Sequence, residues 1–222
     1  QTRFRVPESS VIPLPADVPA ERALLAANAE TALNAIWDAR IAPGTRCLVV
    51  GAGMVGWLVT ALLSPRVDLS ITLTNVRPQT GVNTDDFGVN FVAPGDVPAG
   101  AFDVAFHCSA SGAGLQTALD SLDFEGRVIE LSWYGDKPVE ISLGGNFHAN
   151  RLSIISSQVG HVSPARRAAY SYRDRLSAAL AALKDPRLDA LITDDVQFRD
   201  LPGALPGLLA PDAPGIATRI VY

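Results

Sequence analysis

Apolar positions along the chain alternate between two spacings. Short β-branched runs predict strands, and apolar residues three or four positions apart predict amphipathic helices. The first predicted strand begins at Arg46 and leads into a glycine-rich turn at residues 51–56. After this turn the apolar positions have helical spacing: Val55, Leu58, Val59 and Leu62. The segment therefore predicts a strand, a tight turn and a helix in direct succession.

The rest of the chain repeats this alternation. Further strands are predicted at residues 69–74, 89–92, 103–108, 127–132, 152–156, 188–192 and 216–222. Helices are predicted at residues 20–39, from the glycine turn to about residue 63, and at 115–122, 164–183 and 201–209. The segment between residues 78 and 87 is poor in helix formers, so any crossover helix there should be short or degenerate. Alternating strands and helices predict an α/β fold, a Rossmann-type doubly wound parallel sheet with flanking helices.

Proline content and periodicity divide the chain into three parts. Residues 1–19 hold four prolines and show no periodicity, so they predict an extended arm. Residues 20–160 contain the alternating strands and helices of the predicted Rossmann-type domain. Residues 161–222 contain a long predicted helix and a closing segment.

The glycine turn contains the clearest ligand-binding motif of the sequence. Its letters fit G-x-G-x-x-G, and its position between a strand and a helix raises that motif above chance. Gly51 permits the tight turn, Gly53 leaves room for a pyrophosphate, and Gly56 lets the helix approach the strand. The free N–H groups at the start of the helix would face the phosphates. The sequence therefore predicts a dinucleotide site, with an ordinary glycine-rich βα turn as the alternative.

The end of the second strand bears on which dinucleotide binds. An acidic residue that holds the ribose 2′-hydroxyl is usual there, roughly 20 residues after the glycines. Here the position is Asn75, which does not repel a 2′-phosphate, and Arg77 follows. Arg77 could pair with that phosphate or lie against the adenine. These residues favour NADP over NAD, unless Arg77 is only a solvated loop residue.

Composition narrows the class of protein. The 222 residues are 48% hydrophobic and 18% charged, with a net charge of −5. This balance is typical of a globular protein and gives no basic footprint for nucleic acid or an anionic membrane surface. No apolar run suits a membrane span. Cys47 and Cys108 both lie in apolar, strand-like runs, which indicates buried thiols in a reducing cytoplasm.

Other polar residues give weaker signals. His107 and Cys108 are adjacent in a predicted strand, point to opposite faces, and so cannot converge on one metal ion. A core or cofactor-lining role is expected for them. The run at residues 109–114 does not satisfy G-x-S-x-G, so the sequence does not predict a hydrolase. Four arginines are expected on the exposed side of the long helix, as surface charge: Arg166, Arg167, Arg173 and Arg175.

The order of these features resembles the medium-chain dehydrogenase/reductase superfamily, in its zinc-type alcohol dehydrogenase branch. The matching stretches are residues 25–35, the glycine turn, and residues 102–109, 124–132 and 188–193. The stretches at residues 130–136 and 156–160 resemble a bacterial subgroup of zinc-binding dehydrogenases. The resemblance implies that the chain is the cofactor domain and closing tail of such an enzyme. The arm would then be a remnant of the mostly β catalytic domain that precedes this point in the family.

The resemblance also implies a set of cofactor-binding residues. Thr31 matches the threonine near the nicotinamide, and Asn75 and Arg77 match the ribose and adenine end. Cys108 and Ser109 match the loop that flanks the adenosine half, and Leu131 and Ser132 match the strand end that meets the carboxamide. The remaining matches are the pyrophosphate turn and the loop after the sixth strand: Gly51, Gly53, Met54, Val55, Gly56 and Ser156.

Zinc ligands are not matched. The family's later catalytic ligand falls on Ala27, and the only histidines are His107, His148 and His161. With two distant cysteines, a structural zinc site is not expected. The catalytic residues of this chain remain unassigned, and a group that polarises the substrate oxygen would have to come from outside it.

The functional expectation is an NAD(P)-dependent oxidoreductase that moves hydride between an alcohol or carbonyl substrate and a nicotinamide cofactor. The chain alone would then be inactive unless a catalytic domain is supplied. Two alternatives stay open: a non-catalytic dinucleotide-binding module, and an S-adenosylmethionine-dependent methyltransferase. The resemblance further implies a homodimer that pairs through the edge at residues 152–156.

Overall fold

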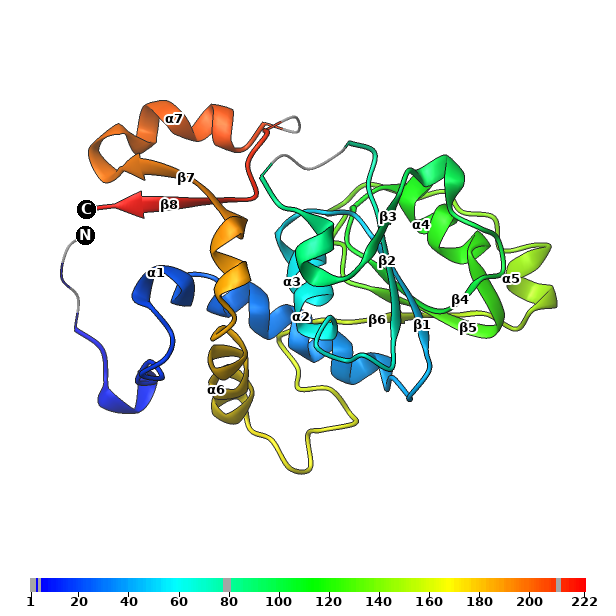
Figure 1. Ribbon diagram of the computed structural model, residues 1–222, viewed down its shortest axis with the longest axis horizontal. Coiled ribbons are helices and arrows are strands. Elements are labelled where there is room, and N and C mark those ends of the chain that lie inside the picture. The colour runs from blue at the N-terminus through cyan, green and yellow to red at the C-terminus, as the bar shows by residue number, and fades with distance from the viewer. Residues whose placement is uncertain (1–2, 4, 78–80, 211–212) are drawn as a thin grey trace.

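Six parallel strands form the central sheet of the computed structural model, which describes residue 3 and residues 5–77, 81–210 and 213–222. Their spatial order is β3-β2-β1-β4-β5-β6 (Figure 1). Their bounds are Arg46–Val50 (β1), Ser70–Thr74 (β2), Asn90–Val92 (β3), Phe102–His107 (β4), Leu122–Glu130 (β5) and Ser153–Ser156 (β6). This is the order of a doubly wound Rossmann sheet, so the predicted fold class is confirmed.

Helices cover both faces of the sheet. The helices are α2 (Ala26–Ala39), α3 (Met54–Leu63) and α6 (Tyr172–Ala182) on one side, and α4 (Gly112–Asp120) and α5 (Asn146–Ala149) on the other. The alternation within β1 shows why both layers form: Cys47 and Val49 join the first core cluster, whereas Leu48 and Val50 join the second. A strand that is apolar on both faces is typical of a parallel sheet buried between helices.

The C-terminal part forms a second, smaller sheet. A 3-10 helix, η4 (Pro186–Leu191), leads from α6 to β7 (Ile192–Gln197). After η5 (Phe198–Asp200) and α7 (Leu201–Leu208), the chain returns as β8 (Ala217–Val221), which pairs in parallel with β7. Figure 1 shows this unit in orange and red beside the main sheet.

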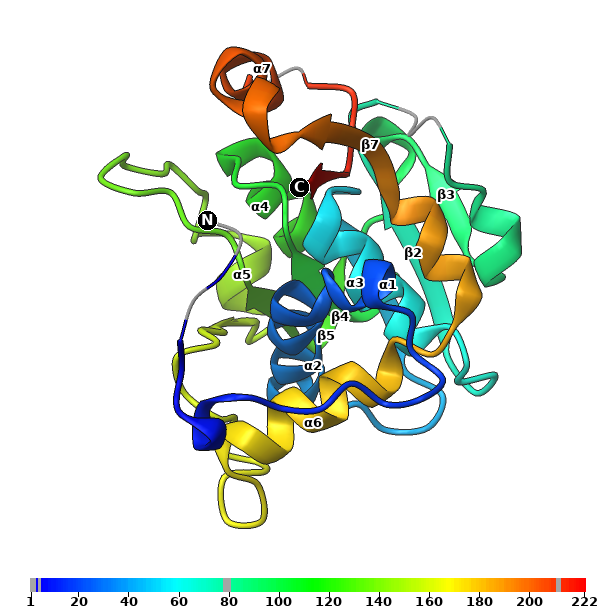
Figure 2. The same cartoon turned by 90° about the vertical axis from the view of Figure 1, so that its left-hand side faces the viewer.

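The remaining elements are short. They are η1 (Glu8–Ser10), α1 (Ala20–Ala23), η2 (Thr84–Phe87) and η3 (Pro94–Asp96). The part of the crossover between β2 and β3 that the structure describes therefore carries only one 3-10 turn, as its poor helix formers predict. Arg173 of α6 donates hydrogen bonds to the carbonyl oxygens of Ser9 (3.0 Å) and Val11 (2.9 Å), which holds the N-terminal arm along α6 (Figure 2).

The long predicted helix at residues 164–183 is wrong in its first half. Residues 164–169 form turns, and α6 begins only at Tyr172. Ser171 accepts a hydrogen bond from the Asp174 N–H, and the Asp174 carboxylate accepts one from the Ser171 N–H. This capping box stabilises a helix start at that point, and it overrides the helix signal of Pro164.

Two other boundaries also differ. The predicted strand at residues 188–192 is wrong, because residues 186–191 are the 3-10 helix η4. Asp185 caps this helix by accepting from the Arg187 N–H, Pro186 occupies its first position, and Leu188 and Leu191 are buried in the core. The predicted helix at residues 20–39 is interrupted between α1 and α2, at residues 24–25.

The expectation that Arg175 is surface charge is also wrong. Its side chain is only 3% exposed, and Nε lies 3.0 Å from the Glu30 carboxylate of α2. Its guanidinium also donates to the Asn34 side-chain oxygen (2.7 Å) and the His161 carbonyl (3.1 Å). Arg175 therefore ties α6 and the preceding loop to α2, whereas Arg166, Arg167 and Arg173 are exposed as expected.

Candidate functional site

The glycine turn between β1 and α3 is built as the motif requires. Gly51 has a φ of 103°, and a Cβ there would lie 2.9 Å from backbone atoms of Cys108 and Ser109. Its N–H donates to the Thr74 carbonyl at 2.8 Å, which joins the turn to the end of β2. At Gly56, a Cβ would overlap the Gly51 carbonyl oxygen. The packing of the protein itself therefore requires glycine at both positions.

Gly53 differs from these two glycines. It precedes the first residue of α3, has a negative φ of −79°, and a Cβ built on it meets no atom within 4 Å. The described part of the protein therefore gives no packing reason for a glycine at this position. A ligand that passes close to the backbone at the start of α3 supplies such a reason.

A cavity of about 610 Å³ opens beside this turn. It lies at the carboxyl ends of β1, β2 and β4, where α/β sheets bind ligands. Its described lining comes from five separate stretches of the chain: Val50, Gly51, Gly53, Thr74, Asn75, Val76, Arg77, Pro94, Cys108, Ser109, Ser111, Ala113, Gly114, Thr117, Ala213, Pro214 and Gly215. The residues just before β8 thus form part of its wall.

The cavity brings together six of the sequence-predicted site residues: Gly51, Gly53, Asn75, Arg77, Cys108 and Ser109. The other seven are not among its described lining residues. Met54, Val55 and Gly56 form the first turn of α3 behind the glycine turn. Thr31 lies within α2, where its hydroxyl donates to the Ala27 carbonyl at 3.1 Å. The last three lie at the carboxyl ends of β5 and β6. Leu131 and Ser132 come directly after β5, and Ser156 is the last residue of β6.

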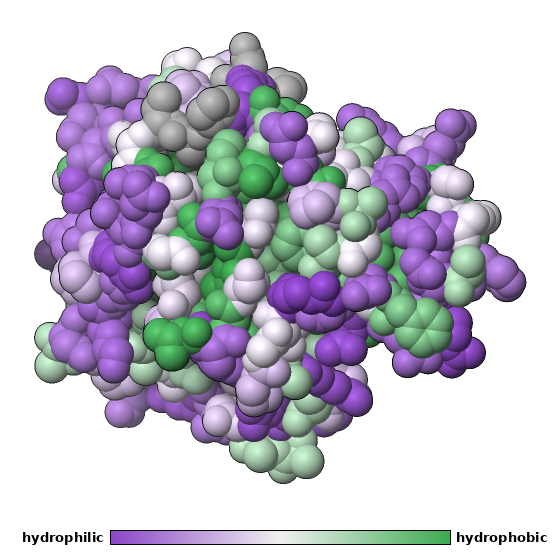
Figure 3. Space-filling model, turned by 45° about the vertical axis from the view of Figure 1, so that its right-hand side comes forward, coloured by the Kyte–Doolittle hydropathy of each residue, from purple (hydrophilic) through white to green (hydrophobic). Residues whose placement is uncertain are grey.

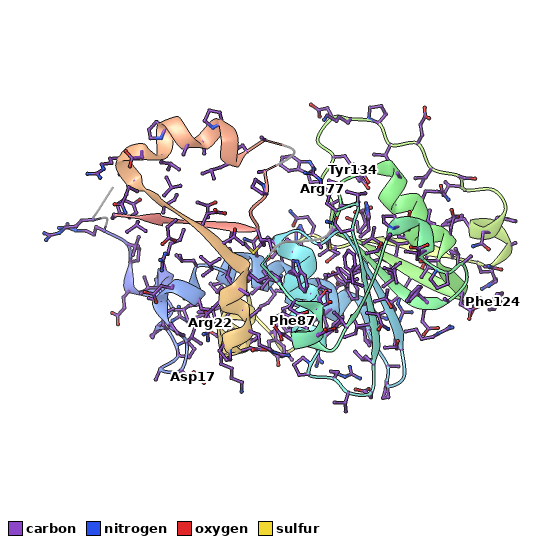
Figure 4. The ribbon with its side chains drawn as sticks, turned by 45° about the horizontal axis from the view of Figure 1, so that its top comes forward. Asp17, Arg22, Arg77, Phe87, Phe124 and Tyr134 are labelled. Atoms are coloured by element: carbon purple, nitrogen blue, oxygen red, sulfur yellow. The ribbon has the colours of Figure 1, made fainter. Side chains whose placement is uncertain are left out.

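The adenosine end of the predicted site is polar. The Asn75 side-chain amide donates to the Arg77 carbonyl oxygen at 2.8 Å, which shapes the loop after β2. Figure 4 shows Arg77 and Tyr134 toward the top of the view and Phe124, near the start of β5, at its right. Arg77 therefore lies at the carboxyl end of the sheet, on the cavity wall.

One buried hydroxyl in the cavity lining lacks a partner. Thr74 is fully buried at the end of β2, and its Oγ1 has no hydrogen-bond partner among the described residues. An unsatisfied buried hydroxyl costs about 1–3 kcal/mol. Together with the open space at Gly53, this orphaned group fits a polar ligand in the cavity.

Sequence reasoning missed a hydrogen-bonded cluster beside the cavity. His107 is fully buried, and its Nδ1 lies 2.9 Å from the Glu130 carboxylate. Its Nε2 lies 2.7 Å from the Ser109 hydroxyl. The register of β4 and β5 places His107 opposite Glu130. The spacing of residues within each strand does not show which strands pair, so the sequence analysis could not predict this cluster.

The surroundings of the Glu130 carboxylate lower its pKa. Burial alone would raise the pKa of Glu130, but hydrogen bonds and charge from His107, with the Ser132 N–H, bring that pKa below its usual range. Burial and the nearby Glu130 charge raise the pKa of Tyr134, whose phenol hydroxyl donates to Glu130 at 3.2 Å. The neighbouring Trp133 is 89% exposed.

Among the described residues, no three His, Cys, Asp or Glu side chains gather as a metal site.

No helix among the described residues is long and apolar enough to cross a membrane. Figure 3 shows one face of the molecule, on which apolar atoms gather in a central band between hydrophilic margins.

No protein-family model matches the chain, and no curated protein matches its sequence. Solved structures do match. L-Idonate 5-dehydrogenase from Escherichia coli is 19% identical, with a TM-score of 0.80 over 99% of this chain and 62% of that one.

Two further matches contain a cofactor. One is a zinc-binding dehydrogenase from Sinorhizobium meliloti bound to NADP, at 15% identity, with a TM-score of 0.79 over 98% of this chain and 64% of that one. The other is a short chain alcohol dehydrogenase from Escherichia coli complexed with NADH, at 14% identity, with a TM-score of 0.77 over the same shares. This chain spans about three fifths of the length of these proteins. Its fold is that of the corresponding part of these dehydrogenases, as the sequence resemblance predicts.

Proposed function

We propose that the chain binds NADP or NAD in the 610 Å³ cavity and serves as the cofactor-binding part of an oxidoreductase. One observation carries this proposal. A Cβ added at Gly53 would meet no protein atom, and Gly53 lines a cavity at the strand ends. A phosphate group at the start of α3 would receive N–H groups and the positive end of the helix dipole.

The residues at each end of the cavity suggest how the cofactor would lie. Thr74, Asn75 and Arg77 would hold the adenosine half, and the neutral Asn75 together with the Arg77 guanidinium favours NADP. Cys108 and Ser109 would flank the same half. By the family resemblance, Thr31, Leu131 and Ser132 would lie toward the nicotinamide and Ser156 beyond it.

The reaction we propose is hydride transfer between an alcohol and a carbonyl. The bound nicotinamide supplies the hydride chemistry, and the residues of this chain bind and orient it. Because the chain spans only about 62% of the first matched structure, the activity of the whole enzyme is part of the proposal. No observation favours the methyltransferase alternative.

The test is a thermal-shift titration with NADP, NAD and S-adenosylmethionine. A ligand that binds only the folded state adds about 2.7 kcal/mol of stability at 100 times its Kd. We expect a rise in Tm with NADP that exceeds the rise with NAD, and none with S-adenosylmethionine. The absence of a shift with either dinucleotide would contradict the proposal.

An arginine variant tests the NADP preference. Arg77→Ala should weaken NADP binding about 10-fold or more while leaving NAD binding nearly unchanged, because a charge-assisted hydrogen bond contributes about 1.5–3 kcal/mol. Arg199→Ala, which removes an exposed arginine that pairs only with Asp200 among the described residues, is the matched control. Equal loss of both cofactors in Arg77→Ala would assign that residue to the adenine instead.

We further propose that the protein is a homodimer that pairs through β6. This strand is the outer edge of the described sheet, and Ile155 on it is 37% exposed. An exposed apolar edge is a template for pairing with another strand. Light scattering at micromolar concentration should give twice the chain mass, and Ile155→Lys should give the monomer mass. A wild-type monomer would overturn this assignment.

A cytoplasmic location is the last part of the proposal. Both Cys47 and Cys108 are free thiols. Burial, the largest influence, raises the pKa of Cys47 to about 12. Burial likewise raises the pKa of Cys108. Thiols kept protonated in this way suit a reducing compartment. Cell fractionation of the tagged protein tests this location.

A further inference from the structure

We propose that Ser109, His107 and Glu130 form a nucleophile–base–carboxylate triad that hydrolyses small acyl esters at the wall of the cavity. Ser109 also lines the proposed dinucleotide site, but the hydrolysis needs no bound dinucleotide. The three residues come from the carboxyl ends of two adjacent strands: His107 ends β4, Ser109 follows it, and Glu130 ends β5. The register of the two strands sets His107 opposite Glu130.

The distances are those of an assembled triad. His107 Nε2 lies 2.7 Å from the Ser109 Oγ, and Nδ1 lies 2.9 Å from both Glu130 oxygens. Both contacts are within the hydrogen-bond range expected between nucleophile, base and orienting carboxylate. With the Nδ1 proton donated to Glu130, Nε2 is left as the acceptor for the Ser109 proton.

Neighbouring groups hold this tautomer in place. Ser132 donates its N–H to the Glu130 carboxylate at 2.7 Å, and Tyr134 donates its hydroxyl to the same carboxylate at 3.2 Å. On the other side of the imidazole, Ser111 Oγ lies 3.1 Å from Ser109 Oγ. Because Ser109 gives its proton to His107, Ser111 is the donor in that pair. The His107, Glu130, Ser109 and Ser111 side chains thus each have a hydrogen-bond partner within the cluster.

Ser109, rather than Cys108, is the nucleophile. Burial and the Glu130 charge raise the pKa of the Cys108 thiol, which disfavours the reactive thiolate. Cys108 and Ser109 both line the cavity, but of the two only Ser109 has a hydrogen bond to His107 among the described residues. Gly51 also lies nearby, since a Cβ at this position would lie 2.9 Å from the Ser109 backbone.

The first turn of α4 supplies the partner for developing negative charge. A Cβ at Gly114 would overlap the Ser109 Oγ and lie 3.0 Å from His107 Nε2, so the nine-residue helix starts directly against the nucleophile. Ser111 caps Gly114, and the preceding N–H groups of Gly112 and Ala113 have no carbonyl within the helix to bond. These groups are the donors we assign to the oxyanion of an acyl intermediate.

The reaction balances with an ester and water alone. Ser109 Oγ forms a bond to the ester carbonyl carbon as its proton passes to His107 Nε2. The bond from that carbon to the alcohol oxygen breaks, and the departing alkoxide takes the proton from Nε2. Water then attacks the acyl-serine, gives its proton to Nε2, and the acid leaves as the Ser109 oxygen recovers that proton. No oxidant or reductant takes part.

The test uses the full chain with p-nitrophenyl acetate and a fluorophosphonate probe. Ser109→Ala should lower kcat/KM for the ester by about 10²–10⁴-fold and abolish covalent labelling. Mass spectrometry of the labelled wild type should place the adduct on Ser109. Ser177→Ala, which removes an exposed serine of α6, is the matched control and should keep both activities.

The positioning role of Glu130 has its own readout. Glu130→Gln keeps the shape but not the charge, so kcat should fall about 10²-fold or more while KM changes little. Circular dichroism and Tm identify any variant that has not folded, and wild-type labelling does not depend on variants at all. An unlabelled wild type, an adduct on another residue, or full hydrolysis by folded Ser109→Ala would each overturn the proposal. Failure of NADP binding would leave these readouts unchanged, so the two proposals fail separately.

Discussion

The glycines of the βα turn are under different physical constraints. Gly51 needs its positive φ and Gly56 needs the absence of a Cβ, because protein atoms occupy the space around both. Gly53 needs neither for folding. Substitution can therefore separate the stability of the fold from its capacity to bind a ligand.

We expect Gly56→Ala to lower the free energy of unfolding by about 1–3 kcal/mol, because the new methyl group meets the Gly51 carbonyl oxygen. Gly53→Ala should leave Tm within a few degrees of wild type but weaken NADP binding at least about 10-fold. Chemical denaturation and calorimetric titration of the two variants check this contrast. Unimpaired NADP binding by Gly53→Ala would show that the phosphate does not approach that backbone.

Arg175 provides a second contrast at the residue scale. Its guanidinium is buried and bonded to Glu30 and Asn34. Removing one partner of a buried ion pair costs about 3–5 kcal/mol, since the other charge stays buried. Arg175→Leu should lose that much in urea denaturation, whereas Arg167→Ala, at an exposed position, should change stability by less than about 0.5 kcal/mol. Equal effects of the two variants would refute the burial argument.

At the scale of elements, an ion pair joins two segments far apart in the sequence. Arg22 of α1 donates to both oxygens of Asp189 in η4, at 2.7 Å each, and to the Lys184 carbonyl at 3.1 Å. Figure 4 shows Arg22 beside the end of α6. This contact anchors the N-terminal helix to the segment that leads into β7.

The Arg22–Asp189 contact predicts a pH dependence. The hydrogen bond and the charge of Arg22 lower the pKa of Asp189 in the folded state. A carboxylate with a depressed folded pKa stabilises the protein above its unfolded pKa, about 3.9, and loses this contribution as pH falls further. Unfolding measured from pH 7 to pH 3 should therefore show a steeper acid loss in wild type than in Asp189→Asn. Identical slopes would show that the pair contributes nothing in solution.

Elements defined by neighbouring residues were predictable from the sequence. The run before Gly51 and the helical spacing after it fixed β1 and α3, because both signals lie within a few residues. The start of α6 was missed because the Ser171 capping box decided it rather than Pro164. Contacts that depend on tertiary structure were not predictable: Arg175 meets Glu30 across 145 positions, and His107 meets Glu130 through strand register.

At the scale of the whole molecule, residues that precede the last strand reach the cavity at the glycine turn. Residues 213–215, just before β8, line it together with the glycine turn and the loop after β2. The strand ends and Gly51 were predicted to meet there, but nothing in the sequence indicated that the closing segment would join them. The predicted three-part division of the chain and the nicotinamide-side residues remain predictions.

This arrangement predicts which amides a cofactor should protect. In hydrogen–deuterium exchange, saturating NADP should slow exchange in peptides that cover residues 51–57 and 213–217, which border the cavity. Peptides from α5, which packs on the other side of α4, should not change. Slowed exchange in the first region alone would place the cofactor away from the closing segment.

The exposed side chain of Trp133 gives the protein a built-in optical reporter. The three tryptophans have different surroundings: Trp57 is buried against Phe87, Trp37 packs on Tyr170, and Trp133 lies in solvent. Acrylamide should therefore quench the emission of Trp133 first, and that component should be the reddest. Trp133 is next to Tyr134, which contacts His107, so a molecule seated at the ends of β4 and β5 would change this emission without any added label.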